Sequence, residues 1–272
     1  DTTYPRGSFE SLLGPVEDFA TEAKALQILS CPWTPKSKIS FEPTQDSDQI
    51  LELQDNTFNI DPPGCKDIDD VLTIQKNEDI WKIYITIADV ARWFHPDTAE
   101  FELAQKIAAT TYQDGQAVAP MLSKQYSEDK CSLLPGQDRH GVALEIHWCP
   151  IQKNICSTPV FHEVRIQNQK SYTYESIYKS DPKILEVLTD FTSFLAGRPV
   201  GDSHEWIEQC MLLYNKEVAK LLQNLGCGIL RAHDAPFEEK RNTLLAIDPC
   251  LEKLAFQAAK YVPVGSDASH YG

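Results

Sequence analysis

The 272-residue sequence lacks any long hydrophobic run, and no stretch approaches 18 consecutive apolar residues, so no membrane-spanning helix is expected. Basic residues are also few: 25 Lys and Arg stand against 40 Asp and Glu, which gives a formal net charge of −15. Domains that bind nucleic acid usually carry a basic surface, so this balance at first argues against such a ligand. Hydrophobic residues make up 42% of the chain, which is enough for a folded core and excludes an acidic disordered tail.

The sequence has eight cysteines, but no two of them form a C-x-x-C pair and no His lies at zinc-finger spacing from them. Their scatter through apolar segments predicts reduced core thiols rather than disulfides. The first residues have neither the charged region nor the apolar region of a signal peptide. These observations favour an intracellular protein, and they do not choose among cytoplasm, nucleus and organelle.

Hydrophobic alternation predicts two hairpins, the first pairing residues 71–74 with 81–88 and the second pairing 142–148 with 160–166. Helical periodicity predicts helices at residues 16–29, 98–110, 202–225 and 251–259. Asp202 and Glu205 have the spacing of a capping box at the start of the third helix, and Gly226 would end it. Hairpins interleaved with helices predict an α+β domain with a mixed, largely antiparallel sheet and surrounding helices.

Four aspartates fall within ten residues just before the first predicted strand: Asp61, Asp67, Asp69 and Asp70. The Pro62-Pro63-Gly64 turn between the first two excludes a helix and can fold the carboxylates toward one another. Carboxylates gathered this closely repel each other unless they are solvated, protonated or bound to cations. A ligand set made only of oxygen suits Mg²⁺ or Mn²⁺ rather than zinc.

Such a cluster can support two-metal phosphodiester hydrolysis, in which cations activate water and stabilise the leaving oxygen. The alternatives are a solvated acidic loop or a calcium site. The calcium loop pattern fails because the sixth position counted from Asp67 is not glycine.

Residues 59–71 resemble the T-I-D-x-x-x-x-x-D-x-D-D-A signature of the RNase II/RNase R (RNB) family of exoribonucleases, with Asn in place of Thr and Val in place of Ala. Further segments resemble other motifs of that family in the same order: residues 84–94, 117–133, 171–178, 207–215 and 228–236. Residues 4–14 resemble the join from a preceding cold-shock domain. The resemblance therefore covers nearly the whole chain.

The resemblance implies an RNB-type catalytic domain that hydrolyses single-stranded RNA from its 3′ end to nucleoside 5′-monophosphates, with Mg²⁺ or Mn²⁺ and a two-metal mechanism. The family's four aspartates fall on the four named above, which would hold the metals and orient water. Its base-clamping tyrosine falls on Tyr112 and its tyrosine near the terminal nucleotide on Tyr174, with Tyr172 as a rival. The implied partners are single-stranded RNA, flanking OB-fold or S1-type domains or a larger RNA-processing complex, and no membrane.

By this resemblance, residues 1–50 are a lead-in from a cold-shock-like region, and residues 51–272 are a catalytic domain that stops just before the family's arginine-bearing segment. That stop, and the acidic balance, motivate an alternative: a catalytically inactive RNB-fold scaffold or RNA-processing subunit of a larger assembly. A metal-dependent phosphohydrolase for small substrates is a third reading. Two residues keep open roles: Asp89 either supports the carboxylates or caps a helix, and His233 either touches RNA or lies in an ordinary turn.

Overall fold

The computed structural model describes residues 7–33, 43–45, 49–113, 116–266 and 270–271. The chain forms two compact units. Unit 1 joins residues 1–45 with 89–132, and unit 2 joins residues 46–88 with 133–272. The predicted cold-shock join and the end of the chain lie partly outside the described residues. The predicted domain boundary at residue 50 stays a prediction.

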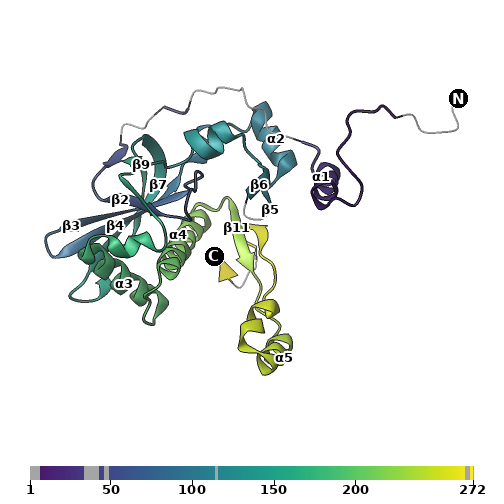
Figure 1. Ribbon diagram of the computed structural model, residues 1–272. Helices are drawn as coiled ribbons and strands as arrows, with labels where there is room; N and C mark the ends of the chain where they lie inside the picture. The colour runs from purple at the N-terminus through teal and green to yellow at the C-terminus, as the bar shows by residue number, and fades with distance from the viewer. Residues whose placement is uncertain (1–6, 34–42, 46–48, 114–115, 267–269, 272) are drawn as a thin grey trace. The chain divides into compact units, whose positions relative to one another are not determined.

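Unit 2 is built on an eight-stranded sheet with the order β1-β9-β7-β4-β3-β2-β10, in which β8 pairs with β7 (Figure 1). The strands are β1 (Leu51–Leu53), β2 (Thr57–Ile60), β3 (Asp70–Asn77), β4 (Ile80–Ala88), β7 (Asp138–Cys149), β8 (Asn154–Ile155), β9 (Val160–Gln167) and β10 (Lys170–Tyr172). The pairs β1–β9 and β2–β10 at the two edges are parallel, and the pairs between them are antiparallel. The predicted mixed, largely antiparallel sheet is confirmed.

Both predicted hairpins are present in this sheet. Strands β3 and β4 pair along their whole length, from Asp70 opposite Ile87 to Asn77 opposite Ile80. Strands β7 and β9 pair antiparallel, and β7 begins four residues earlier than alternation predicted. The alternation is visible in the sequence because successive strand side chains point to opposite faces of the sheet.

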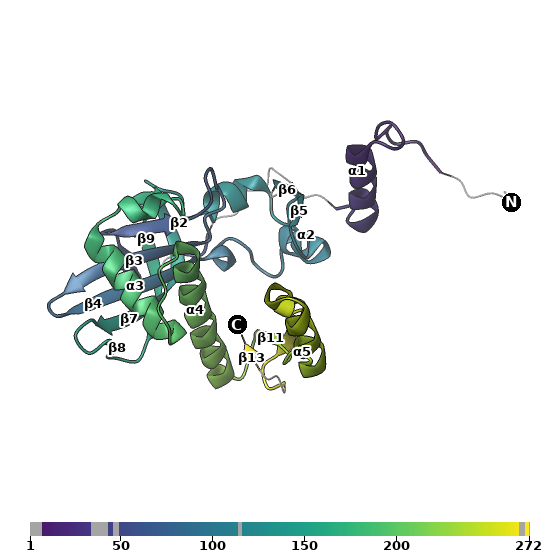
Figure 2. The same ribbon diagram turned by 60° about the horizontal axis from the view of Figure 1, so that its bottom comes forward.

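Two helices, α3 (Pro182–Ala196) and α4 (Ser203–Leu225), cover one face of the sheet (Figures 1 and 2). Trp148 on β7 meets Phe191 on α3 edge-on, with ring centroids 5.6 Å apart. Phe161 on β9 meets Tyr214 on α4 at 5.5 Å, and the Tyr214 hydroxyl donates to the Val142 carbonyl at 3.0 Å. These contacts form the larger hydrophobic core of the unit.

The opposite face carries a second, smaller core. Its buried residues are Leu53, Ile68, Val71, Tyr84, Leu133, Ala143, Val164 and Ile166. Ile68 lies between two of the predicted metal ligands, Asp67 and Asp69, and is only 2% exposed. Burial of this one side chain therefore anchors the acidic loop to the sheet.

Helix α4 confirms the predicted helix at residues 202–225, with one correction at its start. Asp202 is the N-cap, but its carboxylate accepts from the His204 N–H, and the Glu205 side chain binds Arg198 instead of reaching back to the cap. The Asp202 carboxylate also accepts from the Glu205 N–H, so the predicted capping box is half formed. At the other end Gly226 adopts a left-handed conformation, φ 67°, as the predicted C-terminal stop requires.

The last part of unit 2 differs from the sequence prediction. A three-stranded sheet, β12-β11-β13, is formed by Lys260–Pro263, Ile229–His233 and His270–Tyr271. Helix α5 (Glu238–Ile247) and a 3₁₀ segment, η4 (Pro249–Ala255), replace the predicted helix at 251–259. Asp248 is extended and Pro249 has no N–H to donate, so the α-helix ends before the predicted one would begin. His233 lies in β11, not in a turn.

Unit 1 contains α1 (Phe19–Ser30), η1 (Val90–Arg92), α2 (Ala99–Ile107), the hairpin β5–β6 (Thr111–Gln113 and Gln116–Ala119) and the π-helical turn η2 (Tyr126–Lys130). The predicted helices at 16–29 and 98–110 are confirmed as α1 and α2, capped by Asp18 and Thr98. Asp89 accepts from the Arg92 N–H at 3.2 Å. Of its two open roles, the helix cap is the one observed.

Two further predictions concern cysteines and membranes. Cys131, Cys149 and Cys210 are buried, as predicted for core thiols, whereas Cys156, Cys227 and Cys250 are exposed. Within the described ranges, no helix combines the length and apolar character needed to cross a membrane.

Candidate active site

The four aspartates lie on one loop that joins two neighbouring antiparallel strands. Asp61 follows the last residue of β2, and Asp70 is the first residue of β3. Between them the chain turns at Pro62-Pro63-Gly64, where the Cys65 N–H donates to the Pro62 carbonyl at 3.2 Å. Gly64 has φ 81°, a conformation that residues with a Cβ rarely adopt. The predicted turn is therefore present, and it returns the chain toward its starting strand.

Backbone hydrogen bonds hold the loop at several points. The Asp61 N–H donates to the Tyr172 carbonyl at 3.0 Å. The Ile68 carbonyl accepts from the Leu133 N–H and the Asp69 carbonyl accepts from the Ala88 N–H, each at 2.9 Å. These backbone hydrogen bonds fix the course of the loop that carries the carboxylates.

A buried pair of asparagines orients Asp61. The Asn59 side-chain amide donates to Asp61 Oδ2 at 2.8 Å and to the Ser171 hydroxyl at 3.0 Å. The Asn168 amide in turn donates to Asn59 Oδ1 and to the Leu133 carbonyl, both at 2.8 Å. Asn59 and Asn168 are both almost fully buried, so this chain of hydrogen bonds fixes the Asp61 carboxylate from the protein interior.

The carboxylates lie close enough to shift each other's pKa values. Burial, together with the charges of Asp61 and Asp69, raises the pKa of Asp70 to about 7. Burial and the charge of Asp67 also raise the pKa of Asp61, while the Asn59 hydrogen bond opposes the rise. Desolvation by the surrounding protein, with the charges of Asp67 and Asp61, raises the pKa of Asp69. The structure therefore brings the four predicted residues into one electrostatic cluster.

The donor chemistry of this cluster fits a hard divalent cation. All four side chains offer oxygen, and a cation between them would relieve the repulsion among their charges. In the ranges that the structure describes, no three His, Cys, Asp or Glu side chains gather closely enough to form a finished metal site. The loop thus has suitable ligands whose charges interact, but their oxygen atoms do not form a complete coordination site in the described residues.

Tyr174 is the predicted tyrosine that lies beside this cluster. Burial raises the pKa of Tyr174, and the charges of Asp61 and Asp70 add to the rise. Its rival, Tyr172, meets Phe58 edge-on at 5.7 Å and packs against the larger core. Both tyrosines pack against the larger core, and the charges of Asp61 and Asp70 act on Tyr174.

Tyr112 belongs to unit 1. It lies on β5 with 59% of its surface exposed, in a groove lined also by residues of α1 and β6. In this groove Gln27 on α1 donates a side-chain hydrogen bond to the Val118 carbonyl at 3.2 Å. An exposed ring in a groove can stack on a base, as the sequence prediction requires.

The sequence motifs did not predict a role for three further residues. Asn59 stands where the family signature has threonine, and neither Asn168 nor His204 belongs to a motif that predicted a role. Asn168 is 109 residues from its partner Asn59, and their contact depends on which strands pair. Sheet topology, rather than local pattern, brings them together.

The fold and the loop together define an α+β domain with a carboxylate-rich site where two strands of its sheet meet. Residues 51–181 match the family model of the RNB domain. This match confirms the resemblance to the RNB family that the motifs predicted.

Several curated proteins are similar to this chain. A probable exosome complex exonuclease RRP44 of Caenorhabditis elegans is 25% identical over 90% of this chain and 31% of its own length. Exosome complex exonuclease RRP44 homolog A of Arabidopsis thaliana is 32% identical over 89% of this chain and 32% of its own. Ribonuclease R of Buchnera aphidicola is 25% identical over 80% of this chain and 36% of its own. The chain spans about a third of the length of these relatives.

Solved structures share the fold. RNase R of Mycoplasma genitalium, in complex with ribose methylated single-stranded RNA, has a TM-score of 0.72 at 22% identity, covering 87% of this chain and 45% of that one. Yeast Ssd1, a pseudonuclease, has a TM-score of 0.75 at 16% identity, covering 93% and 42%. The same fold therefore occurs in a ribonuclease and in a pseudonuclease.

Proposed function

We propose that this chain is the catalytic part of an exoribonuclease that hydrolyses single-stranded RNA from its 3′ end to nucleoside 5′-monophosphates. The observation that carries the proposal is the complete set of four aspartates on one loop, coupled to each other through their charges. The RNB domain and the named activities of the RRP44 and RNase R relatives support the reaction class.

In this proposal Asp61, Asp67, Asp69 and Asp70 hold Mg²⁺ or Mn²⁺. When bound, such cations lower the pKa of an attacking water and stabilise the leaving oxygen. The protein's own contribution is to fix the ligands. Asn59 holds Asp61 by a hydrogen bond, and the buried Ile68 side chain anchors the stretch from Asp67 to Asp69.

Tyr112 and Tyr174 are proposed to contact the RNA. Stacking on aromatic rings accepts any base, so it suits an enzyme that removes nucleotides regardless of sequence. With a formal charge of −15 the chain offers little general attraction for phosphates, and further OB-fold or S1-type domains, or a larger assembly, would supply the basic surface. The RRP44 relatives are named as exonucleases of the exosome complex.

A second candidate function is an RNB-fold scaffold without catalysis. One observation favours it: the pseudonuclease Ssd1 has the same fold with a TM-score of 0.75. The presence of all four aspartates favours the enzyme instead.

The decisive experiment uses the complete protein and a single-stranded RNA labelled at its 5′ end. The enzyme should shorten this RNA from the 3′ end with Mg²⁺ or Mn²⁺, and Asp69→Asn should lower the rate by at least about 10², as expected for a lost ligand. Asp79→Asn is the matched control, because Asp79 is an exposed residue in the β3–β4 turn. Absence of shortening with either metal would leave the scaffold as the better account, whereas an unchanged rate in Asp69→Asn would contradict the proposed role of the aspartates.

A further inference from the structure

The ring of Tyr174 is stacked flat on the imidazole of His204. The two ring centroids lie 3.7 Å apart and the planes differ by only 6°. Tyr174 lies just after β10, and His204 lies in the first turn of α4. The imidazole lies in van der Waals contact with one face of the tyrosine ring, so it blocks tilting of the ring toward that side.

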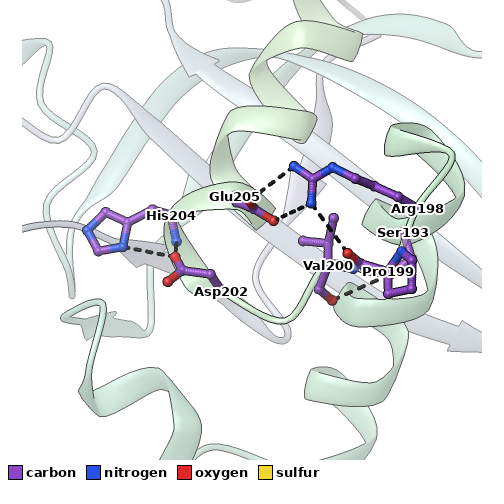
Figure 3. A network of polar contacts seen from close by, with 7 residues as sticks. All are labelled: Ser193, Arg198, Pro199, Val200, Asp202, His204 and Glu205. Atoms are coloured by element: carbon purple, nitrogen blue, oxygen red, sulfur yellow. Dashed lines mark hydrogen bonds and ion pairs between the residues drawn. The ribbon is translucent and has the colours of Figure 1, made fainter. Parts of the chain in front are cut away.

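His204 is itself held by the residue that caps its helix. Asp202 Oδ1 accepts from the His204 N–H at 2.7 Å and lies 3.1 Å from the ring atom Nδ1 of the same histidine (Figure 3). One carboxylate oxygen therefore fixes both the backbone and the imidazole of His204.

The first turn of α4 is tied to the segment that carries Tyr174. The Ser203 hydroxyl donates to the Tyr174 carbonyl at 2.8 Å, and the Ser203 N–H donates to the Tyr178 hydroxyl at 3.0 Å. On the other side of the turn, Arg198 binds both carboxylate oxygens of Glu205, at 3.1 and 3.2 Å (Figure 3). The backbones that bear the two stacked rings are thus fixed relative to each other.

Apart from the N-cap bond of Asp202, the contact between the side chains of Asp202 and His204 contributes little to the fold. Their side chains are 60% and 66% exposed, and water screens an ion pair that is this exposed. Because the pair holds a ring beside the carboxylate cluster, a role in the candidate site accounts for the arrangement better than a role in stability does.

We propose that His204, held by Asp202, is a positioning residue that fixes the ring plane of Tyr174 beside the carboxylate loop. By covering one face of the ring, His204 restricts the last nucleotide of the substrate to the part of Tyr174 that it does not cover. The role rests on the proposed function, since it acts on the residue proposed to contact the RNA end. It is a positioning role because His204 acts through Tyr174.

The first test measures kcat and KM for RNA shortening by the complete protein. His204→Ala should lower kcat about tenfold with little change in KM, because small misplacements near reacting groups cost rate more than binding. His204→Phe keeps a flat ring and should restore most of kcat. In a Tyr174→Ala background, His204→Ala should have no further effect. Gln223→Ala, at an exposed position in the last turn of α4, is the control.

The second test needs no activity. In proton NMR spectra of the RNA-free protein, the ring signals of His204 should be displaced by the ring current of Tyr174, and Tyr174→Leu should abolish the displacement. Undisplaced signals overturn the positioning role, as do additive losses of kcat in the double variant. A wild-type protein that leaves RNA intact overturns the proposed function, and this role with it. An active wild type with an equally active His204→Ala overturns the positioning role alone.

Discussion

Asn59 donates a hydrogen bond to Asp61 across 2.8 Å, and it does so from a position that is 1% exposed. The bond stabilises the charged form of a carboxylate whose pKa is otherwise raised by burial and by the charge of Asp67. A buried amide therefore partly offsets the repulsion that the acidic loop creates. Measurable consequences are expected for this hydrogen bond, for the binding of Mg²⁺ or Mn²⁺, for the polar contacts of Glu145 and for the packing of α3 on the sheet.

Asn59→Ala should reduce both activity and stability. The substitution leaves Asp61 without its side-chain donor and Asn168 without one of its two acceptors, and an unsatisfied buried group costs about 1–3 kcal/mol. Urea unfolding should show this loss, and the rate of RNA shortening should fall at the same time. The control is Asn77→Ala, at an exposed position near the β3–β4 turn, which should change the free energy of unfolding by less than about 0.5 kcal/mol.

Mg²⁺ or Mn²⁺ should stabilise the folded protein. A cation that binds only the folded state at a hundred times its dissociation constant adds about 2.7 kcal/mol. Thermal unfolding with excess cation should therefore occur at a higher Tm than unfolding with EDTA. The increase should be lost in Asp69→Asn and kept in Asp79→Asn. An equal increase in both variants would place the cation elsewhere.

Stability should fall in acid because of Glu145. Burial alone would raise its pKa, but hydrogen bonds from His147 and Lys82, with the nearby His162, lower the pKa of this carboxyl below its ordinary 4.5. A lowered folded-state pKa stabilises the protein above pH 4.5, and the contribution disappears as pH falls through the folded-state value.

Glu145→Gln should therefore be less stable than the wild type near neutral pH, with the difference closing in acid. Free energies of unfolding measured by urea across this range test the prediction. Glu163→Gln, an exposed residue on the neighbouring strand β9, serves as the comparison. A wild-type to Glu145→Gln difference that stays constant with pH would contradict the assignment.

Phe191→Ala should lower the free energy of unfolding of the protein by weakening the core between α3 and the sheet. Phe191 is fully buried and packs on Trp148, and loss of a buried phenylalanine costs about 3–5 kcal/mol. Chemical unfolding should show a loss of that size. Phe256→Ala, which removes a ring that is 54% exposed, should cost far less. Equal losses would mean that α3 does not pack on the sheet as described.

Local patterns predicted those features that depend on neighbours in the sequence. The hairpin of β3 and β4 follows from alternation, and the loop after Asp61 follows from two prolines and a glycine. Helix α3 had clear signals, with Asp181 as N-cap, Pro182 in the first turn and a left-handed Gly197 at its end, yet no helix was predicted there. Its signals are caps, which mark a helix only when the apolar spacing between them is also read.

Contacts between distant segments could not be predicted from sequence patterns alone. The bond between Asn168 and Asn59 depends on the parallel pairing of β10 with β2, and the stack of Tyr174 on His204 depends on where α4 begins. Neither contact has a local signal in the sequence, because one strand register or one helix turn decides whether the groups meet. The resemblance to the RNB family supplied the fold and the aspartates, but it did not supply their supports.

The acidic loop also implies that the residues suited to bind a cation lower the stability of the metal-free protein. Holding several like charges at the junction of β2 and β3 destabilises the metal-free protein. Burial adds to this cost, because it removes water that would solvate the charged carboxylate of Asp70. Replacing Asp70 with Asn should therefore make the metal-free protein harder to unfold while impairing any cation-dependent chemistry. A cation that binds there would remove the repulsion among the aspartates, so the loop has its highest electrostatic free energy without a cation.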